Sequence, residues 1–178
     1  MKVSDCEKKA DDIRLKYNPN QLVPFPYRNI TKEKLDLNIN IGNFSDELDH
    51  ISGATIYDEE SNEFTIIING NKPETRQAFT IAHELGHYFL HADILKSEKL
   101  IVDGDDYLEN KRVLYRLDEA KRNQIEIEAN NFAAAILMPR DLVLDAWERL
   151  EDIQECAKVF GVSAIAMTIR LERLSLIE

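Results

Sequence analysis

The sequence predicts an α+β fold, in which a small three-stranded sheet packs on helices and a helical segment follows at the C-terminus. Three observations lead to this class. The β-rich runs are confined to residues 35–69, helical patterns occupy most of the chain on either side, and a two-helix pattern closes the chain. With 178 residues, of which 44% are hydrophobic, the chain is long enough to bury one core. We expect residues 1–145 to form the main domain and residues 146–178 a helix-turn-helix-like segment packed on it.

The first part of the chain supplies one helix and the sheet. Apolar side chains recur at helical intervals over residues 4–17, which predicts the first helix. After a proline-rich segment, apolar and polar residues alternate over residues 35–41, and this period of two predicts a half-buried strand. Two further β-rich runs, residues 52–57 and 63–69, are separated by the polar sequence DEESN, which predicts a hairpin.

Two long helices are expected in the middle of the chain. Pro73 fits the first turn of a helix over about residues 73–92, whose apolar side chains share one face. A second helix, over about residues 118–137, ends where Pro139 follows a methionine. Residues 100–116 lie between these helices and are weakly patterned, so we interpret them mainly as a loop.

The C-terminal sequence CAKVFGVSAIAMTIRLERL has the pattern of two short helices joined at Gly161, with Ser163 as the N-cap of the second. A DNA-reading helix needs polar or basic side chains near its start, whereas this one starts with Ala164, Ile165 and Ala166. We therefore expect the helix pair to pack on the catalytic core, with docking of a partner protein as the alternative. We expect no direct contact with nucleic acid.

The overall composition argues against two classes of partner. The formal net charge is −11, which is unfavourable for binding nucleic acid through a large basic face. No apolar run approaches the roughly 18 residues that span a membrane, and the N-terminus lacks the apolar core of a signal peptide. We therefore expect a cytoplasmic protein without membrane contact.

The sequence RQAFTIAHELGHYFLHAD, residues 76–93, has the spacing of a metal site. His83 and His87 are about one helical turn apart, so both imidazoles project from one face and can bind one cation. Glu84 lies about 100° around the helix from His83. Its carboxylate is therefore beside the cation, where it can take a proton from a metal-bound water. The alternative interpretation is an ordinary histidine pair with an ordinary glutamate between them.

A catalytic zinc site takes three protein ligands, so a further ligand is needed. His91 lies about 12 Å along the helix axis from His83, too far to share one ion, and we expect it to support a ligand, face the substrate or be structural. On the second long helix, Glu126 and Glu128 point about 200° apart, so at most one of them faces the site. We favour Glu126 because it shares a stripe with Asn130, which could accept a ring N–H from a ligand histidine. Glu128 falls on the more outward side.

Five segments of this chain resemble those of one known family: SGATIY, FTIIING, RQAFTIAHELGHYFLH, EIEANNFAAAILMP and CAKVFGVSAIAMTIRLERL. They cover most of residues 50–174, and on them the sequence resembles the ImmA/IrrE family of bacterial metallopeptidases. The resemblance implies a compact zincin-like metallopeptidase domain in which zinc is held by His83, His87 and Glu126. It also implies that Glu84 is the general base. Zinc is the default metal for two histidines and one carboxylate, although manganese or iron could occupy such a site.

The resemblance also implies a function. Members of the ImmA/IrrE family cleave helix-turn-helix repressor proteins and so derepress genes of mobile elements, phages or DNA-damage responses. We therefore expect a zinc-dependent endopeptidase whose partner is a DNA-binding repressor. The donor that stabilises the oxyanion stays open among Tyr88, His91, Tyr107 and Tyr115. The alternative function is a metal-stabilised binding module that sequesters a repressor, or acts in a toxin–antitoxin-like pair, without cutting it; the glutamate between the paired histidines favours the enzyme.

Overall fold

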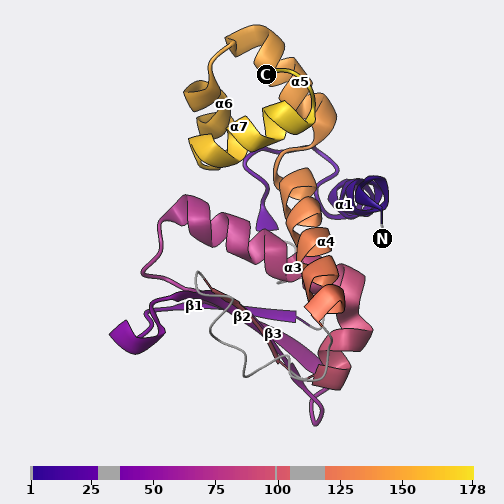
Figure 1. The fold of residues 1–178 in the computed structure, drawn as a ribbon, viewed down its shortest axis with the longest axis vertical. Helices are drawn as coiled ribbons and strands as arrows, with labels where there is room; N and C mark the ends of the chain where they lie inside the picture. The colour runs from indigo at the N-terminus through magenta and orange to yellow at the C-terminus, as the bar shows by residue number, and fades with distance from the viewer. Residues whose placement is uncertain (1, 28–36, 99, 105–118) are drawn as a thin grey trace.

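The predicted α+β class is confirmed by a computed structural model, which describes residues 2–27, 37–98, 100–104 and 119–178 (Figure 1). Helices form most of the described chain and cover one face of a sheet. The described elements, in chain order, are α1 (Val3–Tyr17), β1 (Leu37–Gly42), the 3-10 helix η1 (Asp46–Leu48), β2 (Ile51–Asp58), β3 (Glu63–Asn69), α3 (Glu74–Glu98), β4 (Leu100–Gly104), α4 (Glu119–Leu137), α5 (Arg140–Leu150), α6 (Ile153–Phe160) and α7 (Ala164–Arg173).

The sheet contains the three expected strands and one more. Its order among the described residues is β1-β3-β2-β4. The predicted hairpin is present as the antiparallel pair β2 and β3, and β1 lies parallel to β3 on the other side. The additional strand, β4, pairs antiparallel with β2 and lies in the stretch that we interpreted mainly as a loop. Its 5 residues are too few to show a clear alternation.

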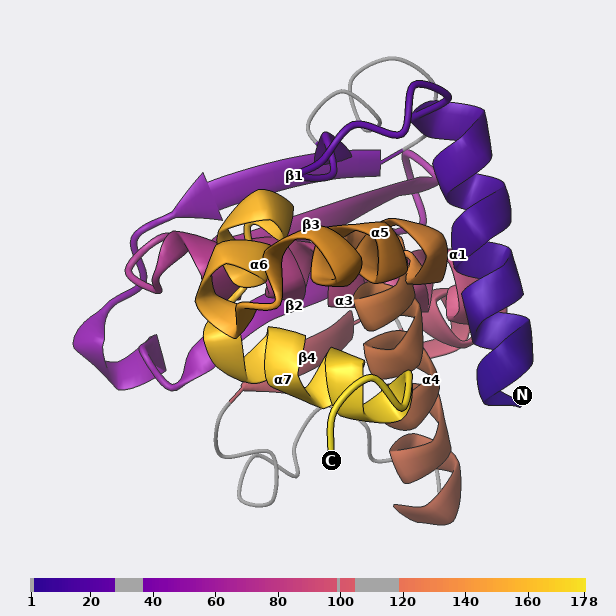
Figure 2. The ribbon, with the colours of Figure 1, turned by 90° about the horizontal axis from the view of Figure 1, so that it is seen from above.

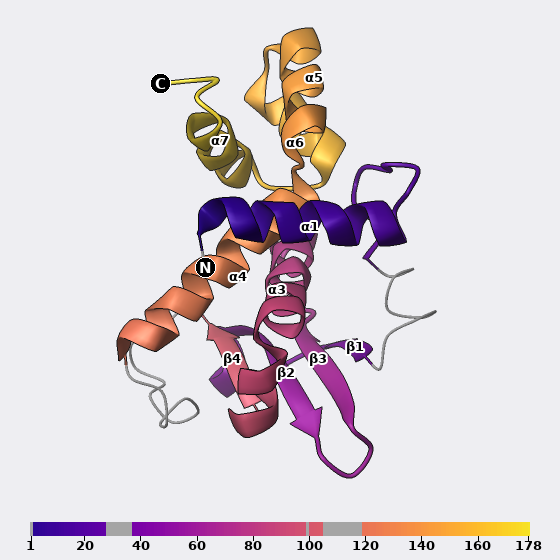
Figure 3. The ribbon, with the colours of Figure 1, turned by 90° about the vertical axis from the view of Figure 1, so that its right-hand side faces the viewer.

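Helix α3 lies between the sheet and α4, and α1 packs against α4 (Figure 3). Alternate side chains of β3 are buried because successive residues of a strand point to opposite faces. Phe64, Ile66 and Ile68 therefore belong to the same buried cluster as Ile81 and Leu85 of α3. This layering leaves α3 with one face toward β2 and another toward α4.

Helices α3 and α4 come into close backbone contact at Gly86. A Cβ atom at Gly86 would lie 3.0 Å from the Cα of Ala129 and 3.1 Å from its carbonyl oxygen, which is tighter than ordinary packing. The absence of a side chain at Gly86 thus permits this approach. Because Gly86 directly precedes His87, and Ala129 follows Glu126 within one helical turn, the contact brings the two sequence motifs together.

Helices α5, α6 and α7 gather at the end of α4 that is farther from the sheet (Figure 1). Seen from above, they lie over α3 and the sheet (Figure 2). The predicted turn is present at Gly161, whose φ of +65° favours glycine, and the Ser163 hydroxyl accepts a hydrogen bond from a backbone N–H of α7. The buried Arg170 links α7 to the rest of the protein. Its Nε donates to the carbonyl of Met138, and its Nη1 pairs with Glu7 of α1.

Two sequence predictions concern the chain as a whole. The division into residues 1–145 and 146–178 falls within α5 and stays a prediction. Among the helices in the described part of the chain, none has the length and apolar character needed to cross a membrane.

Candidate metal centre

Helix α3 presents the two motif histidines side by side. Their ring centroids are 4.6 Å apart and the two Nε2 atoms are 3.0 Å apart, as expected for side chains one turn apart on one helix face. Both side chains are buried, with 3% exposure for His83 and none for His87. The pair therefore offers two buried imidazole nitrogens that converge on one point.

Helix α4 brings a carboxylate to the same point. Glu126 Oε2 lies 3.2 Å from Nε2 of His83, and Glu126 Oε1 lies 3.4 Å from Nε2 of His87. One ligand atom from each of the three residues lies within 4.8 Å of the others. Burial raises the pKa of Glu126, but its contacts with the two rings lower the pKa by more, so the carboxylate is held in its ionised, ligand form. Two imidazole nitrogens and a carboxylate make a donor set that fits a divalent metal ion.

Asn130 lies next to this donor set, on the α4 turn that follows Glu126. Its Oδ1 is 3.1 Å from Nδ1 of His83. Since a carbonyl oxygen can only accept, Nδ1 of His83 donates to Asn130. A neutral ring that binds a cation would do so through its other nitrogen, Nε2, and the contact with Asn130 favours that tautomer. The contact that we expected between Asn130 and a histidine is thus present in the structure.

Glu84 is buried beside the histidines and is held by the sheet. The hydroxyl of Thr55 on β2 donates to Glu84 Oε2 at 2.5 Å, and neither residue is exposed. Thr55 and Gly53 are two residues apart on β2 and therefore lie on the same face of the strand. That face is turned toward α3, since a Cβ at Gly53 would collide with Thr80 of α3. Sequence reasoning missed Thr55. The alternation in SGATIY would assign Ala54 and Ile56 to the core and Thr55 to the other face, so the sequence carried no clear signal for the burial of Thr55.

His91 and Glu128 form a separate pair. Helical geometry breaks at His91 (φ −130°, ψ 24°), and its Nε2 lies 3.1 Å from Glu128 Oε2. Burial and the neighbouring His87 ring lower the pKa of His91 to about 4. We expected Glu128 on the more outward side of α4, but it is only 7% exposed. The reason is tertiary: α1 packs on α4 and covers part of the surface that an isolated helix would expose.

The remaining candidate residues are tyrosines. Tyr88 packs edge-on against Phe64 of β3, with ring centroids 5.1 Å apart, and also contacts Phe89. It is half-buried within this aromatic group. Tyr107 and Tyr115 lie outside the described residues, so their proposed part in stabilising an oxyanion stays a prediction.

Comparison with known protein families identifies the family of this chain. The profile of the IrrE N-terminal-like domain, peptidase family M78, matches residues 33–172. The chain belongs to this family. The IrrE N-terminal-like match includes both α3 and α4, which carry the three converging donors, and extends into α7. The family is one of metallopeptidases, which implies a metal cofactor for its members.

Similar proteins include two that are named as metallopeptidases. The radiation response metalloprotease IrrE of Deinococcus radiodurans is 36% identical over 112 residues, which cover 61% of this chain and 30% of that protein. Metallopeptidase ImmA of Bacillus subtilis is 23% identical over 130 residues, covering 72% of this chain and 67% of that protein. Uncharacterized immunity region protein 2 of Bacillus phage phi105 is 30% identical over 140 residues, covering 78% and 77%. The match thus spans less than a third of the first of these relatives.

A solved structure shares the fold. It is described as a Mycobacterium tuberculosis transcriptional regulator and superposes with a TM-score of 0.63 at 18% identity. The superposition covers 94% of this chain and 55% of that one. Nearly the whole chain therefore has a counterpart of known architecture within a longer protein.

Proposed function

We propose that the chain is a zinc-dependent endopeptidase in which His83, His87 and Glu126 hold the metal and Glu84 is the general base. The observation that carries this proposal is the convergence of three donor atoms from two helices, all within 4.8 Å of one another. Zinc is the metal that this donor set most commonly binds, and manganese or iron suits the same ligands.

The residues of the chain have distinct parts in peptide hydrolysis. A bound zinc ion supplies Lewis-acid chemistry, which makes water more acidic and polarises a peptide carbonyl. Glu84 accepts the proton of the attacking water and delivers it to the leaving amine. Thr55 keeps the Glu84 carboxylate oriented through their hydrogen bond, and Asn130 fixes the ring of His83 through Nδ1. Each of these contacts reduces the freedom of a group that has to be in place during the reaction.

The proposed substrate is a helix-turn-helix transcriptional repressor, whose cleavage derepresses its target genes. Relatives named as a radiation response metalloprotease, as metallopeptidase ImmA and as an immunity region protein of a phage support a regulatory substrate. The apolar start of α7 supports a protein partner in place of DNA, since Ile165 is 74% exposed there. Such a substrate acts on the chromosome, so the proposal places the protein in the cytoplasm.

The test is the substitution Glu84→Gln, assayed on a helix-turn-helix repressor that the wild-type protein binds. The zinc-loaded wild-type protein should produce repressor fragments on a gel. Glu84→Gln should keep its zinc, since Glu84 is not a ligand, and should cleave about 10²–10⁴-fold more slowly, because it lacks the base. Full cleavage by the variant would contradict the role of Glu84. An intact repressor in a stable complex with the wild-type protein would favour the metal-stabilised binding module instead.

A further inference from the structure

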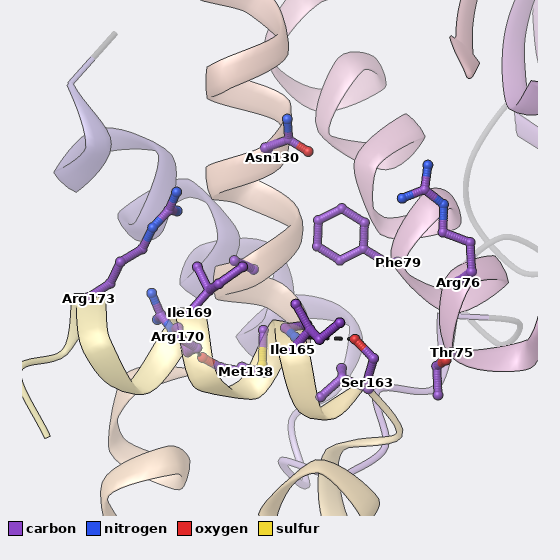
Figure 4. A pocket seen from close by; sticks show the side chains of 13 residues that line it. Thr75, Arg76, Phe79, Asn130, Met138, Ser163, Ile165, Ile169, Arg170 and Arg173 are labelled. Carbon is purple, nitrogen blue, oxygen red and sulfur yellow. Dashed lines mark hydrogen bonds between the residues drawn. The ribbon is translucent and has the colours of Figure 1, made fainter. Parts of the chain in front are cut away.

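A groove lies between the first part of α3, the second half of α4 and helix α7 (Figure 4). Its volume of about 370 Å³ is within the range of ligand-binding pockets. Phe79 of α3 stands on one side, while Ile165 and Ile169 of α7 stand on the other. The groove is therefore an apolar space that the folded chain leaves open.

The two isoleucines of this groove are exposed on the same face of α7. Ile165 is 74% exposed and Ile169 is 45% exposed, although Met167 between them is fully buried. Their spacing of four residues places both on one face of α7. Single exposed apolar residues are common on protein surfaces, but a group that lines a cavity is typical of binding sites.

Two arginines stand at opposite ends of the groove (Figure 4). Arg76 of α3 donates to the hydroxyl of Ser52, and Arg173 at the end of α7 donates to Asn131. These bonds hold both guanidinium groups in place. The described residues that line the groove include no carboxylate, although the chain has a formal charge of −11. Both arginines bring positive charge to the lining, which favours acidic groups in a bound segment.

The groove adjoins the metal centre at Asn130. This residue lines the groove, and its side chain also bonds to the ring of His83. A peptide that occupies the groove would therefore lie against the residue that orients a proposed metal ligand.

We propose that this groove binds the protein substrate through a segment in which an apolar side chain is flanked by carboxylates. The apolar side chain packs between Phe79 and the two isoleucines of α7, and the carboxylates pair with Arg76 and Arg173. The proposal rests on the proposed peptidase function and extends it to the choice of the substrate segment.

The apolar lining favours a protein segment over nucleic acid. Binding to DNA or RNA depends mainly on several basic contacts to phosphates, whereas this groove offers two arginines around an apolar centre. The third arginine that lines it, Arg170, is buried and paired with Glu7. The acidic charge of the rest of the chain would repel a long polyanion.

The test measures peptide binding by fluorescence anisotropy with zinc-loaded Glu84→Gln protein, so that the probe stays intact. The probe is a fluorescein-labelled peptide with two leucines flanked by aspartates. Two matched peptides replace either the aspartates by lysines or the leucines by glutamines. The acidic apolar peptide should bind at least about ten-fold more tightly than either of them. Adding Ile165→Ser should weaken its binding by about ten-fold, and adding Arg173→Glu should shift the preference toward the lysine peptide.

The control is Arg149→Glu, which reverses a charge on exposed α5 away from the groove and should leave all three affinities unchanged. Thermal melting checks the fold of each variant. If Arg173→Glu does not fold, Ile165→Ser still tests the groove, because this mostly exposed side chain contributes little packing.

Equal binding of the three peptides, or no effect of Ile165→Ser, would overturn the proposal. It would also be overturned by tighter binding of a labelled DNA duplex that Arg173→Glu abolishes. The repressor assay separates this inference from the peptidase function. Cleavage without a peptide preference would contradict only the proposed role of the groove. A peptide preference without cleavage would contradict only the proposed peptidase function.

Discussion

The metal centre and the neighbouring groove depart from the usual burial pattern in opposite directions. In the metal centre, ionisable and polar side chains are buried: Glu84, His87 and Thr55 are fully inaccessible. In the groove, apolar side chains are exposed, and Ile165 has 74% of its surface in solvent. The two regions share only a short boundary at Asn130, which bonds to His83 and also lines the groove.

Both departures run against what folding alone would favour. Burying a carboxylate costs free energy unless hydrogen bonds or opposite charges compensate, and exposing an isoleucine forgoes the gain from burying it. Neither choice stabilises the chain on its own. Each fits the proposed binding of a partner from outside: a cation between the buried donors, and an apolar protein segment over the exposed isoleucines.

The comparison of Glu126 with Glu128 should give the largest effect. Both are glutamates of α4 next to a histidine of α3, but only Glu126 lies with the paired His83 and His87. Glu126→Gln removes a proposed ligand and should lower zinc affinity by more than about 100-fold, since even changes beyond the ligands cost about 10–100-fold. Glu128→Gln is the matched control and should cost less than about ten-fold. Competition with a chromophoric chelator measures both, and equal losses would contradict the assignment.

The next effect concerns the hydrogen bond between the sheet and the proposed base. Thr55→Val keeps the shape of the side chain but removes the hydroxyl that Glu84 accepts from. We expect kcat on a repressor substrate to fall by about 10–100-fold with little change in KM, because the base loses its orientation while substrate binding is untouched. Thr55→Ser restores the hydroxyl and should recover most of the rate. A rise in KM with unchanged kcat would exclude this role.

A change at the contact between α3 and α4 links the metal centre to stability. Gly86→Ala places a methyl group 3.0 Å from the Cα of Ala129. We expect the free energy of unfolding to fall by about 1–3 kcal/mol, together with a loss of zinc affinity, because α4 has to move with Glu126. Gly42→Ala is the control, since nothing lies within 4 Å of a Cβ there. Denaturant unfolding of both variants, with and without zinc, checks this, and equal stability would contradict the close contact.

The smallest effect is the pH dependence that His91 introduces. Its pKa of about 4 in the folded protein lies below the ordinary value of 6.5, so the unfolded chain binds the proton more readily. The contribution of His91 to the free energy of unfolding is therefore fully present above pH 6.5 and is lost as the pH falls toward 4. In metal-free protein, His91→Gln should reduce the slope of unfolding free energy over this window by up to about 1.4 kcal/mol per pH unit. An unchanged slope in chemical denaturation would refute the shift.

Local periodicity was sufficient to predict much of the fold and part of the site. The spacing of His83 and His87 on a helix depends only on residues one turn apart, and the side of α4 that carries Glu126 followed from its stripe with Asn130. The hairpin was equally readable because its two β-rich runs lie close together in sequence and are separated only by the polar segment DEESN.

The features that were missed depend on contacts between distant segments. The bond from Thr55 to Glu84 requires the register of β2 against α3, and the burial of Glu128 requires α1 to lie on α4. Strand β4 is defined by its pairing with β2 more than by its own short sequence. The groove likewise forms only when α7 is placed beside α3, which no local pattern encodes.

The most direct test of the metal centre is anomalous diffraction at the zinc edge from crystals of the zinc-loaded protein. We expect one peak that lies about 2.0–2.2 Å from Nε2 of His83, Nε2 of His87 and a carboxylate oxygen of Glu126. A peak between His91 and Glu128, or no bound metal in protein that still cleaves a repressor, would contradict the account.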